Sequence, residues 1–231
     1  MADETGESYD GPILAEDLLL VLFQPDSGTI AGEGTLYYTL AGGVLADLGL
    51  GDHVRTEPGR VGTKVAAVED RPPSDEILRQ GWDYVAAKPR GVQTVLAAIG
   101  PNLRSPLLDR LVERGELRRT SRKKLGVFES TVLEDGGTGR RAELVEQIRK
   151  VLVDGAEPEP RVAALAALLS GSGTLPQFHR EIPWTSPVIA RAKELEQGNW
   201  GAGAAAEAVT RTVTATIVNN VVVATAVLPR G

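Results

Sequence analysis

The sequence predicts a mainly α-helical protein that is interrupted by short β-hairpins. Apolar residues recur at helical spacing through most of the chain, and Pro and Gly stand where helices would begin and end. Strand-like runs are confined to two places. The chain has 231 residues, 42% hydrophobic and 24% charged, which suffices for a substantial core and does not match the composition of a disordered protein.

The composition excludes several chemistries. Because there is no cysteine, disulfides, thiolate metal sites and cysteine nucleophiles are ruled out, and His53 and His179 alone are too few for a His-rich metal centre. The apolar run from Leu18 to Phe23 is far shorter than the ~18 residues needed to cross a bilayer, and no other apolar run approaches that length. We therefore expect a soluble, cytoplasmic protein. Its net charge of −6 argues mildly against a nucleic-acid partner.

The first elements surround a central helix. Residues 1–12 are acidic and polar, which predicts a disordered lead and does not fit a secretory signal. Residues 15–23 are apolar on nearly every side and predict a helix buried at the centre of the fold, ended by turn-forming residues at 24–28. Residues 34–48 predict a second helix, in which Gly42-Gly43 indicates close helix–helix packing.

Later helices are predicted from their caps. Ser74 precedes two acids, which suit the positive end of a helix dipole, and should cap a helix that turns Ile77 and Val85 inward. Ser105 and Ser186 each precede a proline, as at a helix start with a hydroxyl cap. Further helices are expected over 92–99, 139–153, the stretch after 158–160, and 203–228, where helix is favoured over strand.

A pattern of helix, glycine cap and β-hairpin occurs twice. The first copy ends a helix at Leu45–Leu50 and predicts strands on either side of Pro58-Gly59. The second copy ends a helix at Gly115 and predicts a hairpin over 117–133. The repeat is weak in residue identity but clear in pattern.

The second hairpin carries a segregated positive charge. Seven basic residues against three acidic ones lie between Asp109 and Lys124, and three apolar residues follow. The basic residues are Arg110, Arg114, Arg118, Arg119, Arg122, Lys123 and Lys124; the apolar ones are Leu125, Val127 and Phe128. Each cation near an anionic membrane contributes roughly 1 kcal/mol, so together with an apolar wedge they predict a reversible peripheral contact.

Two other interpretations of this hairpin stay open. Its inner face could pack in the core while its charges are merely solvated. Alternatively, the helix, glycine and basic hairpin could form a winged helix on DNA, although the helix at 105–114 offers few base-reading side chains and the chain is acidic overall.

Enzyme activity and cofactors are not expected. Gly201-Ala-Gly203 lacks the third glycine and the preceding strand of a dinucleotide-binding motif, and no Gly-rich turn leads into a phosphate-binding Lys. His179 has no visible catalytic partner and is expected on a surface loop. Trp82 and Trp184 are expected to be partly buried and Trp200 exposed.

The order of several motifs resembles the Golgi phosphoprotein 3 family in its bacterial branch, from about Leu14 to about Leu228. The resemblance rests on Leu18-Leu-Leu-Val-Leu-Phe, Gly28-Thr-Ile, Leu40-Ala-Gly-Gly-Val-Leu-Ala-Asp-Leu-Gly-Leu-Gly-Asp-His-Val and Leu111-Val-Glu-Arg-Gly-Glu-Leu. It implies a central helical bundle ringed by amphipathic helices, with one protruding hairpin. It also implies binding to phosphatidylinositol 4-phosphate and an adaptor role for client proteins.

The family's headgroup pocket is only partly matched. By hand alignment, its tryptophan and three arginines fall on Gly32, Ala41, Pro101 and Arg104, so that Arg104 alone is retained. Losing the ring and two charges removes most of a multidentate phosphate site. The resemblance implies Leu125, Val127 and Phe128 at the apolar tip of the hairpin.

We therefore expect a non-enzymatic peripheral membrane protein with one helical domain over 13–231. Arg104 with the basic cluster at 118–124 should meet anionic lipid headgroups, while the hairpin tip inserts or self-associates. The alternatives are a winged-helix DNA-binding regulator and a protein-binding scaffold that dimerises through its hairpin.

Overall fold

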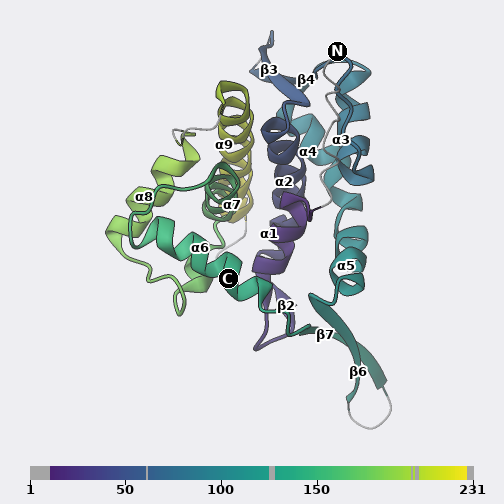
Figure 1. Cartoon of the computed structure of the whole chain (residues 1–231), viewed down its shortest axis with the longest axis vertical. Coiled ribbons are helices and arrows are strands. Elements are labelled where there is room, and N and C mark those ends of the chain that lie inside the picture. Colours follow the sequence, from purple (N-terminus) through teal and green to yellow (C-terminus); the bar gives the residue numbers. More distant parts are fainter. Residues whose placement is uncertain (1–10, 61, 125–127, 199, 201–202, 228–231) are drawn as a thin grey trace, which may run out of the picture.

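The computed structural model describes residues 11–60, 62–124, 128–198, 200 and 203–227, with only the backbone at 122–124, 128–130, 205 and 222–227. Within this part the mainly α-helical fold with short antiparallel hairpins is confirmed (Figure 1).

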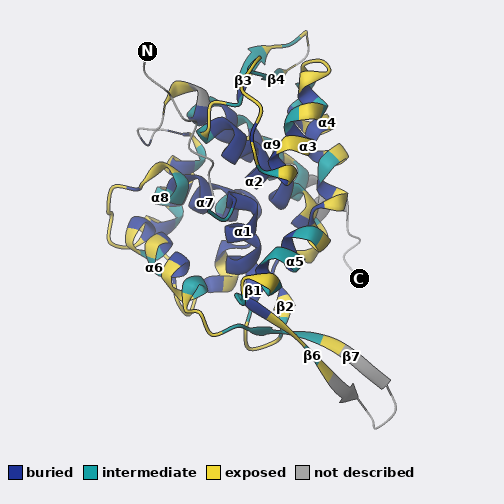
Figure 2. Cartoon of the chain, turned by 45° about the vertical axis from the view of Figure 1, so that its right-hand side comes forward, coloured by how far each residue is buried: buried dark blue, intermediate teal, exposed yellow. Residues whose placement is uncertain are grey.

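The central element is helix α1 (Leu14–Leu22), in which every residue is buried. It contacts α2 (Leu36–Leu50), α5 (Arg104–Glu113), α6 (Arg140–Leu152) and α7 (Pro160–Gly171). The other helices surround it in the burial view (Figure 2). An apolar helix without a polar face requires neighbours on all sides, so the prediction of a buried central helix is confirmed.

Helix α2 packs closely on both α1 and α9 (Ala204–Val227). A Cβ atom at Gly42 would lie 2.7 Å from Ile217 Cδ1 on α9, and one at Gly43 would lie 2.8 Å from Leu18 Cδ1 on α1. The Gly-Gly pair therefore allows two helices to approach α2, as predicted. Helix α9 is helical rather than extended and buries Val209 and Val213.

The remaining elements complete the ring and its connections. They are β1 (Phe23–Gln24), β2 (Thr29–Ile30), the 3₁₀ turn η1 (Glu33–Thr35), α3 (Glu76–Ala86), β5 (Arg90–Gly91), α4 (Val92–Ile99), η2 (Gly100–Asn102), η3 (Leu175–Phe178) and α8 (Ser186–Glu196).

Two hairpins lie at opposite ends of the molecule, and both views place them there (Figures 1 and 2). The first pairs β3 (Val54–Pro58) with β4 (Thr63–Ala67), and β5 adds a third strand beside β4. The second pairs β6 (Leu117–Lys124) with β7 (Phe128–Asp135) in a two-stranded sheet that projects from the helices. The predicted repeat of helix and hairpin is therefore present.

Several cap predictions were wrong. Helix α3 is capped by Asp75, not Ser74: its carboxylate accepts from the backbone N–H groups of Ile77 and Leu78. Ser105 lies inside α5, which begins at Arg104, and Ser186 is the first residue of α8. In each case the serine precedes a proline or an acid, as a cap residue often does, yet a neighbouring residue holds the cap position.

Two tryptophan predictions were also wrong. Trp200 is buried and its indole N–H donates to Leu195 O at 3.1 Å, whereas Trp184 is 41% exposed. Trp200 is buried because it contacts both α8 and α9. The neighbouring glycine in the sequence does not reveal these contacts.

Candidate functional site

The projecting unit consists of α5 and the β6–β7 hairpin. Gly115 has φ +72°, a left-handed conformation that favours glycine, and it turns the chain from α5 into β6. The ladder has eight residue pairs, from Leu117 opposite Asp135 to Lys124 opposite Phe128. At its root Leu117 is buried, and a Cβ at Gly28 of the β1–β2 turn would lie 2.9 Å from Leu133 O. The hairpin is thus held at its base.

Much of the predicted basic cluster is paired within the chain. Arg110 binds Asp75 at 2.6 Å, and Arg114 binds the fully buried Glu16 at 3.0 Å. Both arginines therefore serve α5 packing. Of the remaining cations of the cluster, Arg118 and Arg119 are the ones whose side chains the structure describes.

On the hairpin itself, Arg118 and Arg119 are exposed. Arg119 pairs with Asp109 at 2.6 Å, and Arg118 donates to the carbonyl of Asp135 at 3.2 Å. Exposed pairs of this kind contribute about 0–1 kcal/mol and exchange readily with other partners. These two arginines can therefore turn toward an external anion.

Strand β7 supplies acids that the count over 109–124 left out. The register places Glu134 opposite Arg118 and Glu129 opposite Lys123. Residues 117–135 thus contain five basic and three acidic side chains. The positive charge of the hairpin is real but smaller than the local sequence count suggested.

The structure leaves part of the predicted site untested. Leu125 and Val127 lie outside the described residues. Arg122, Lys123, Lys124 and Phe128 have their backbone in the strands, and their side chains lie outside the described part.

The positions aligned with the family's headgroup pocket hold one cationic side chain, that of Arg104. Ala41 is fully buried inside α2, and the left-handed Gly32 would bring a Cβ to 2.5 Å from Thr174 Cγ2. Pro101 is exposed on η2. Arg104 is half-exposed and already pairs with Glu33 at 3.0 Å. An ion pair between Arg104 and Glu33 therefore occupies this place.

A buried ion-pair network was missed by sequence reasoning. Asp17, on α1, binds Arg140 of α6 and Arg161 of α7, the latter at 2.8 Å. Arg161 also binds Asp47 of α2 at 3.2 Å. Arg140 lies 3.8 Å from Glu116, at the start of the β6–β7 hairpin. The network thus links the hairpin root to the central helices.

The sequence contains a signal for this network. Glu16-Asp17 are two consecutive acids in a helix that is otherwise apolar and buried, and buried carboxylates require partners. The partners could not be identified, because Arg140 and Arg161 lie 123 and 144 positions away from Asp17.

Burial also perturbs protonation. Desolvation raises the pKa of the Asp47 carboxyl above its ordinary 3.8, although the Arg161 guanidinium and the backbone N–H of Leu14 oppose the shift. Desolvation lowers the pKa of Arg141, which donates to Phe23 O at 2.7 Å. Asp47 joins α2 to the start of α1 and to α7, and Arg141 joins α6 to β1.

Two features are absent from the described residues. His, Asp and Glu side chains in this part do not gather into a group that could hold a metal ion. Over the same residues no helix is both long and apolar enough to cross a membrane.

The sequence was also compared with known proteins. The search of curated proteins finds no match. The family model described as Golgi phosphoprotein 3 (GPP34) matches residues 14–212, which cover α1 to the first half of α9. The match includes both helix–hairpin units and the buried network around α1. The chain therefore belongs to the Golgi phosphoprotein 3 (GPP34) family.

Proposed function

We propose that this chain is a non-catalytic peripheral membrane protein that presents the β6–β7 hairpin to anionic lipid headgroups. The observation that carries the proposal is the projection of an eight-pair hairpin with five basic residues from an otherwise helical body (Figure 1). A projecting hairpin can reach a membrane surface without rearrangement of the core. Membership of the Golgi phosphoprotein 3 family supports the same function by analogy.

The proposal does not include a preference for one headgroup. Ala41 is buried and Arg104 is paired with Glu33, so the aligned pocket offers an external phosphate a single guanidinium. We expect binding to depend on the density of negative charge in the membrane. Phosphatidylinositol 4-phosphate should then act through its charge alone.

DNA binding has less support. In a winged helix the side chains of the helix before the wing face the major groove. Here Arg110 and Arg114 of α5 are bound to Asp75 and Glu16 of the same chain, so they are already paired with acids. The other alternative, a protein-binding scaffold that dimerises through its hairpin, is tested by the experiments below.

Vesicle co-sedimentation at low salt tests the proposal. We expect the protein to bind vesicles of phosphatidylcholine with phosphatidylserine and not phosphatidylcholine alone. Each cation near the surface contributes about 1 kcal/mol, so Arg118→Glu with Arg119→Glu should weaken binding by more than about tenfold. Adding phosphatidylinositol 4-phosphate at matched total charge should change little.

The matched control is Arg55→Glu with Arg60→Glu. These arginines are exposed on the β3–β4 hairpin at the opposite end of the molecule, and Arg55 has an acidic partner, Glu57, just as Arg119 has Asp109. The control should bind like wild type. Equal losses in the two variants, or no binding to anionic vesicles, would contradict the proposal.

The alternatives give different results in the same samples. Retention of duplex DNA in a gel shift, lost with the hairpin variant, would favour a DNA-binding protein. A dimer in light scattering that becomes monomeric when the hairpin is shortened, without vesicle binding, would favour a scaffold.

A further inference from the structure

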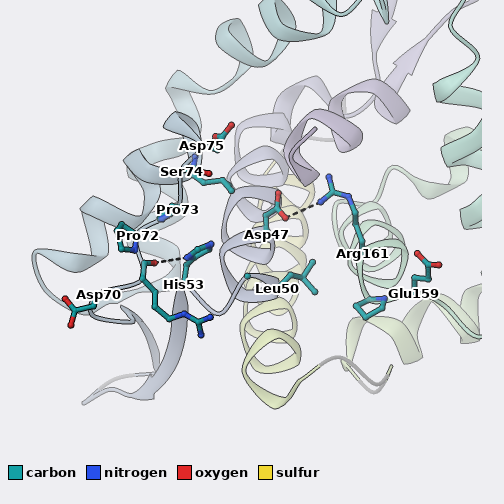
Figure 3. A pocket seen from close by; sticks show the side chains of 14 residues that line it. Asp47, Leu50, His53, Asp70, Pro72, Pro73, Ser74, Asp75, Glu159 and Arg161 are labelled. Atoms are coloured by element: carbon teal, nitrogen blue, oxygen red, sulfur yellow. Dashed lines mark hydrogen bonds and ion pairs between the residues drawn. The ribbon is translucent and has the colours of Figure 1, made fainter. Parts of the chain in front are cut away.

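A cleft with a volume of about 760 Å³ lies at the junction of α2, α3 and α7 (Figure 3). Asp70 and Glu159 lie on opposite sides of it, and Asp47 is bound to Arg161. These charged groups therefore do not point at a common place for a ligand. The charged groups at the base of the β6–β7 hairpin, in contrast, gather at one place, the joint between the hairpin and α5.

The hairpin joins the helices through two short linkers, residues 115–116 before β6 and residues 136–139 after β7 (Figure 1). Four of these six residues are glycine. Gly115, Gly137 and Gly139 have positive φ, and a Cβ at any of the three would meet nothing within 4 Å. Glycines in open space suit a hinge, because they absorb changes of φ and ψ at low cost.

The two linkers form a single joint. A Cβ at Gly136 would overlap the carbonyl oxygen of Gly115, and the backbone N–H of Gly136 donates to Glu116 O at 2.8 Å. The carboxylate of Glu116 accepts from Thr138 Oγ1 at 2.6 Å. The linkers contain no apolar side chain, so turning the joint takes none out of the core. The two strands can therefore turn together as one arm.

An ion pair crosses this joint from the hairpin to α5. Arg119 Nη2 of β6 lies 2.6 Å from Asp109 Oδ1 of α5, and the two side chains are 42% and 48% exposed. Strand β7 is contacted by the β1–β2 turn instead, where Gly28 packs against Val132 and Leu133. Because exposed ion pairs are weak, the tie between β6 and α5 is easily exchanged for another.

Arg119 has two anionic partners to choose between. The proposed function assigns it, with Arg118, to anionic lipid headgroups, and in the lipid-free structure it binds Asp109. The free energy that a cation gains at an anionic membrane surface is comparable with that of an exposed ion pair. A headgroup can therefore displace the Asp109 carboxylate from the Arg119 guanidinium.

We propose that the Arg119–Asp109 ion pair is a lipid-sensitive latch. Without anionic lipid the pair holds the hairpin against α5. When a headgroup binds Arg119, Asp109 is released to solvent and the hairpin turns about the glycine joint. The lipid step rests on the proposed function, whereas the latch itself can be tested in lipid-free protein.

Distance measurements by electron paramagnetic resonance test the latch. The chain has no cysteine, so spin labels can be attached at introduced cysteines. Ser105→Cys on α5 and Ser121→Cys on β6 are exposed positions on either side of the joint. We expect a narrow distribution of label distances, and a broader one when Asp109→Asn is added. If Asp109→Asn leaves the distribution as narrow as before, the latch proposal is wrong.

Two further variants separate the latch from a general loss of structure. Labels at Ser105→Cys and Ala142→Cys both lie on helices, and their distance distribution should not respond to Asp109→Asn. Arg119→Asp alone should broaden the distribution across the joint, and adding Asp109→Arg should narrow it again, because the ion pair is restored with its charges exchanged. Failure of this second substitution to narrow the distribution would contradict the ion pair as the restraint.

The lipid step uses the same labels across the joint. Vesicles of phosphatidylcholine with phosphatidylserine should broaden the distribution, whereas phosphatidylcholine alone and inorganic phosphate should not. Broadening by inorganic phosphate would overturn the assignment to lipid, and vesicle binding without broadening would overturn the lipid step. Absence of vesicle binding would contradict the proposed function, while the lipid-free measurement still decides the latch.

Vesicle affinity gives a second measure of the competition. Asp109→Asn removes the carboxylate that competes for Arg119, so vesicle binding should become about threefold tighter. The control is Glu113→Gln, which removes the same charge from an exposed position of the same helix and should bind like wild type. Equal gains in the two variants would show an effect of net charge alone and would overturn the latch.

Discussion

The two helix–hairpin units share a sequence pattern but are attached to the protein by different forces. The β3–β4 hairpin buries Val54 and Val65 against its surroundings, contacts α9 and α3, and gains β5 as a third strand. Trp82 adds a hydrogen bond from its indole N–H to His53 O at 3.1 Å. Hydrophobic burial therefore holds this hairpin against the helices.

The β6–β7 hairpin buries fewer side chains, and ion pairs flank its root. Among its described side chains Leu117 is the buried one, and no third strand is paired with it in the described part of the chain. Arg114 before it binds Glu16, and Arg140 after it binds Asp17 and approaches Glu116. The difference teaches that one local pattern yields a packed hairpin or a projecting one according to the apolar residues available in its strands.

The largest expected effect tests the ionic root. Asp17→Ala leaves Arg140 and Arg161 without their shared buried carboxylate, so the free energy of unfolding should fall by about 3–5 kcal/mol in urea denaturation. The control is Asp26→Ala, because the Asp26–Arg180 pair is highly exposed and should contribute less than about 0.5 kcal/mol. Equal effects of the two substitutions would contradict the ionic attachment.

The second prediction, with a smaller expected effect, compares a valine substitution in each of the two hairpins. Val65 is fully buried in β4, so Val65→Ala should lower the free energy of unfolding by about 2–3 kcal/mol through lost burial and a cavity. Val132 is only half-buried in β7, and Val132→Ala should cost less than about 1 kcal/mol. The comparison would fail if Val132→Ala destabilised the protein as much as Val65→Ala does.

The smallest effect concerns pH and Asp47. Burial raises the pKa of this carboxyl in the folded protein, so the folded state binds the proton more readily than the unfolded chain does. Its contribution to the free energy of unfolding should rise as the pH falls through the raised pKa, and level off below the ordinary value of 3.8.

Asp47→Asn removes this titration while keeping an oxygen that can accept from Leu14 N–H. The stability of wild type relative to Asp47→Asn should therefore increase as the pH is lowered, and chemical denaturation at several pH values measures this difference. A difference that decreases on acidification would show that Arg161 outweighs the desolvation of Asp47.

Much of the fold was predictable because its signals are local. Residues 15–23 have no polar face over most of their length, Gly42-Gly43 marks close packing, and Gly115 marks the turn into a hairpin; all three are confirmed. The cap predictions are wrong at Ser74 and Ser105. Several neighbouring residues could occupy each cap position, and tertiary packing decides which one does.

The candidate site was less predictable. The sequence indicated a basic helix–hairpin unit, and the structure places Arg118 and Arg119 on a projecting hairpin as expected. The sequence could not show that Arg110 pairs with Asp75 and Arg114 with Glu16, because those partners lie 35 and 98 positions away along the chain. A count of local charge does not distinguish cations that face outward from cations paired with acids of distant segments.

The sequence by itself determined the helical class, the central helix and the two hairpins, because periodicity and turn chemistry act over a few neighbouring residues. Only the tertiary structure decided which hairpin packs and which projects, and which arginines are paired. These outcomes depend on residues distant in the chain meeting in space, and a buried charge such as Asp17 is stable only where such partners arrive together.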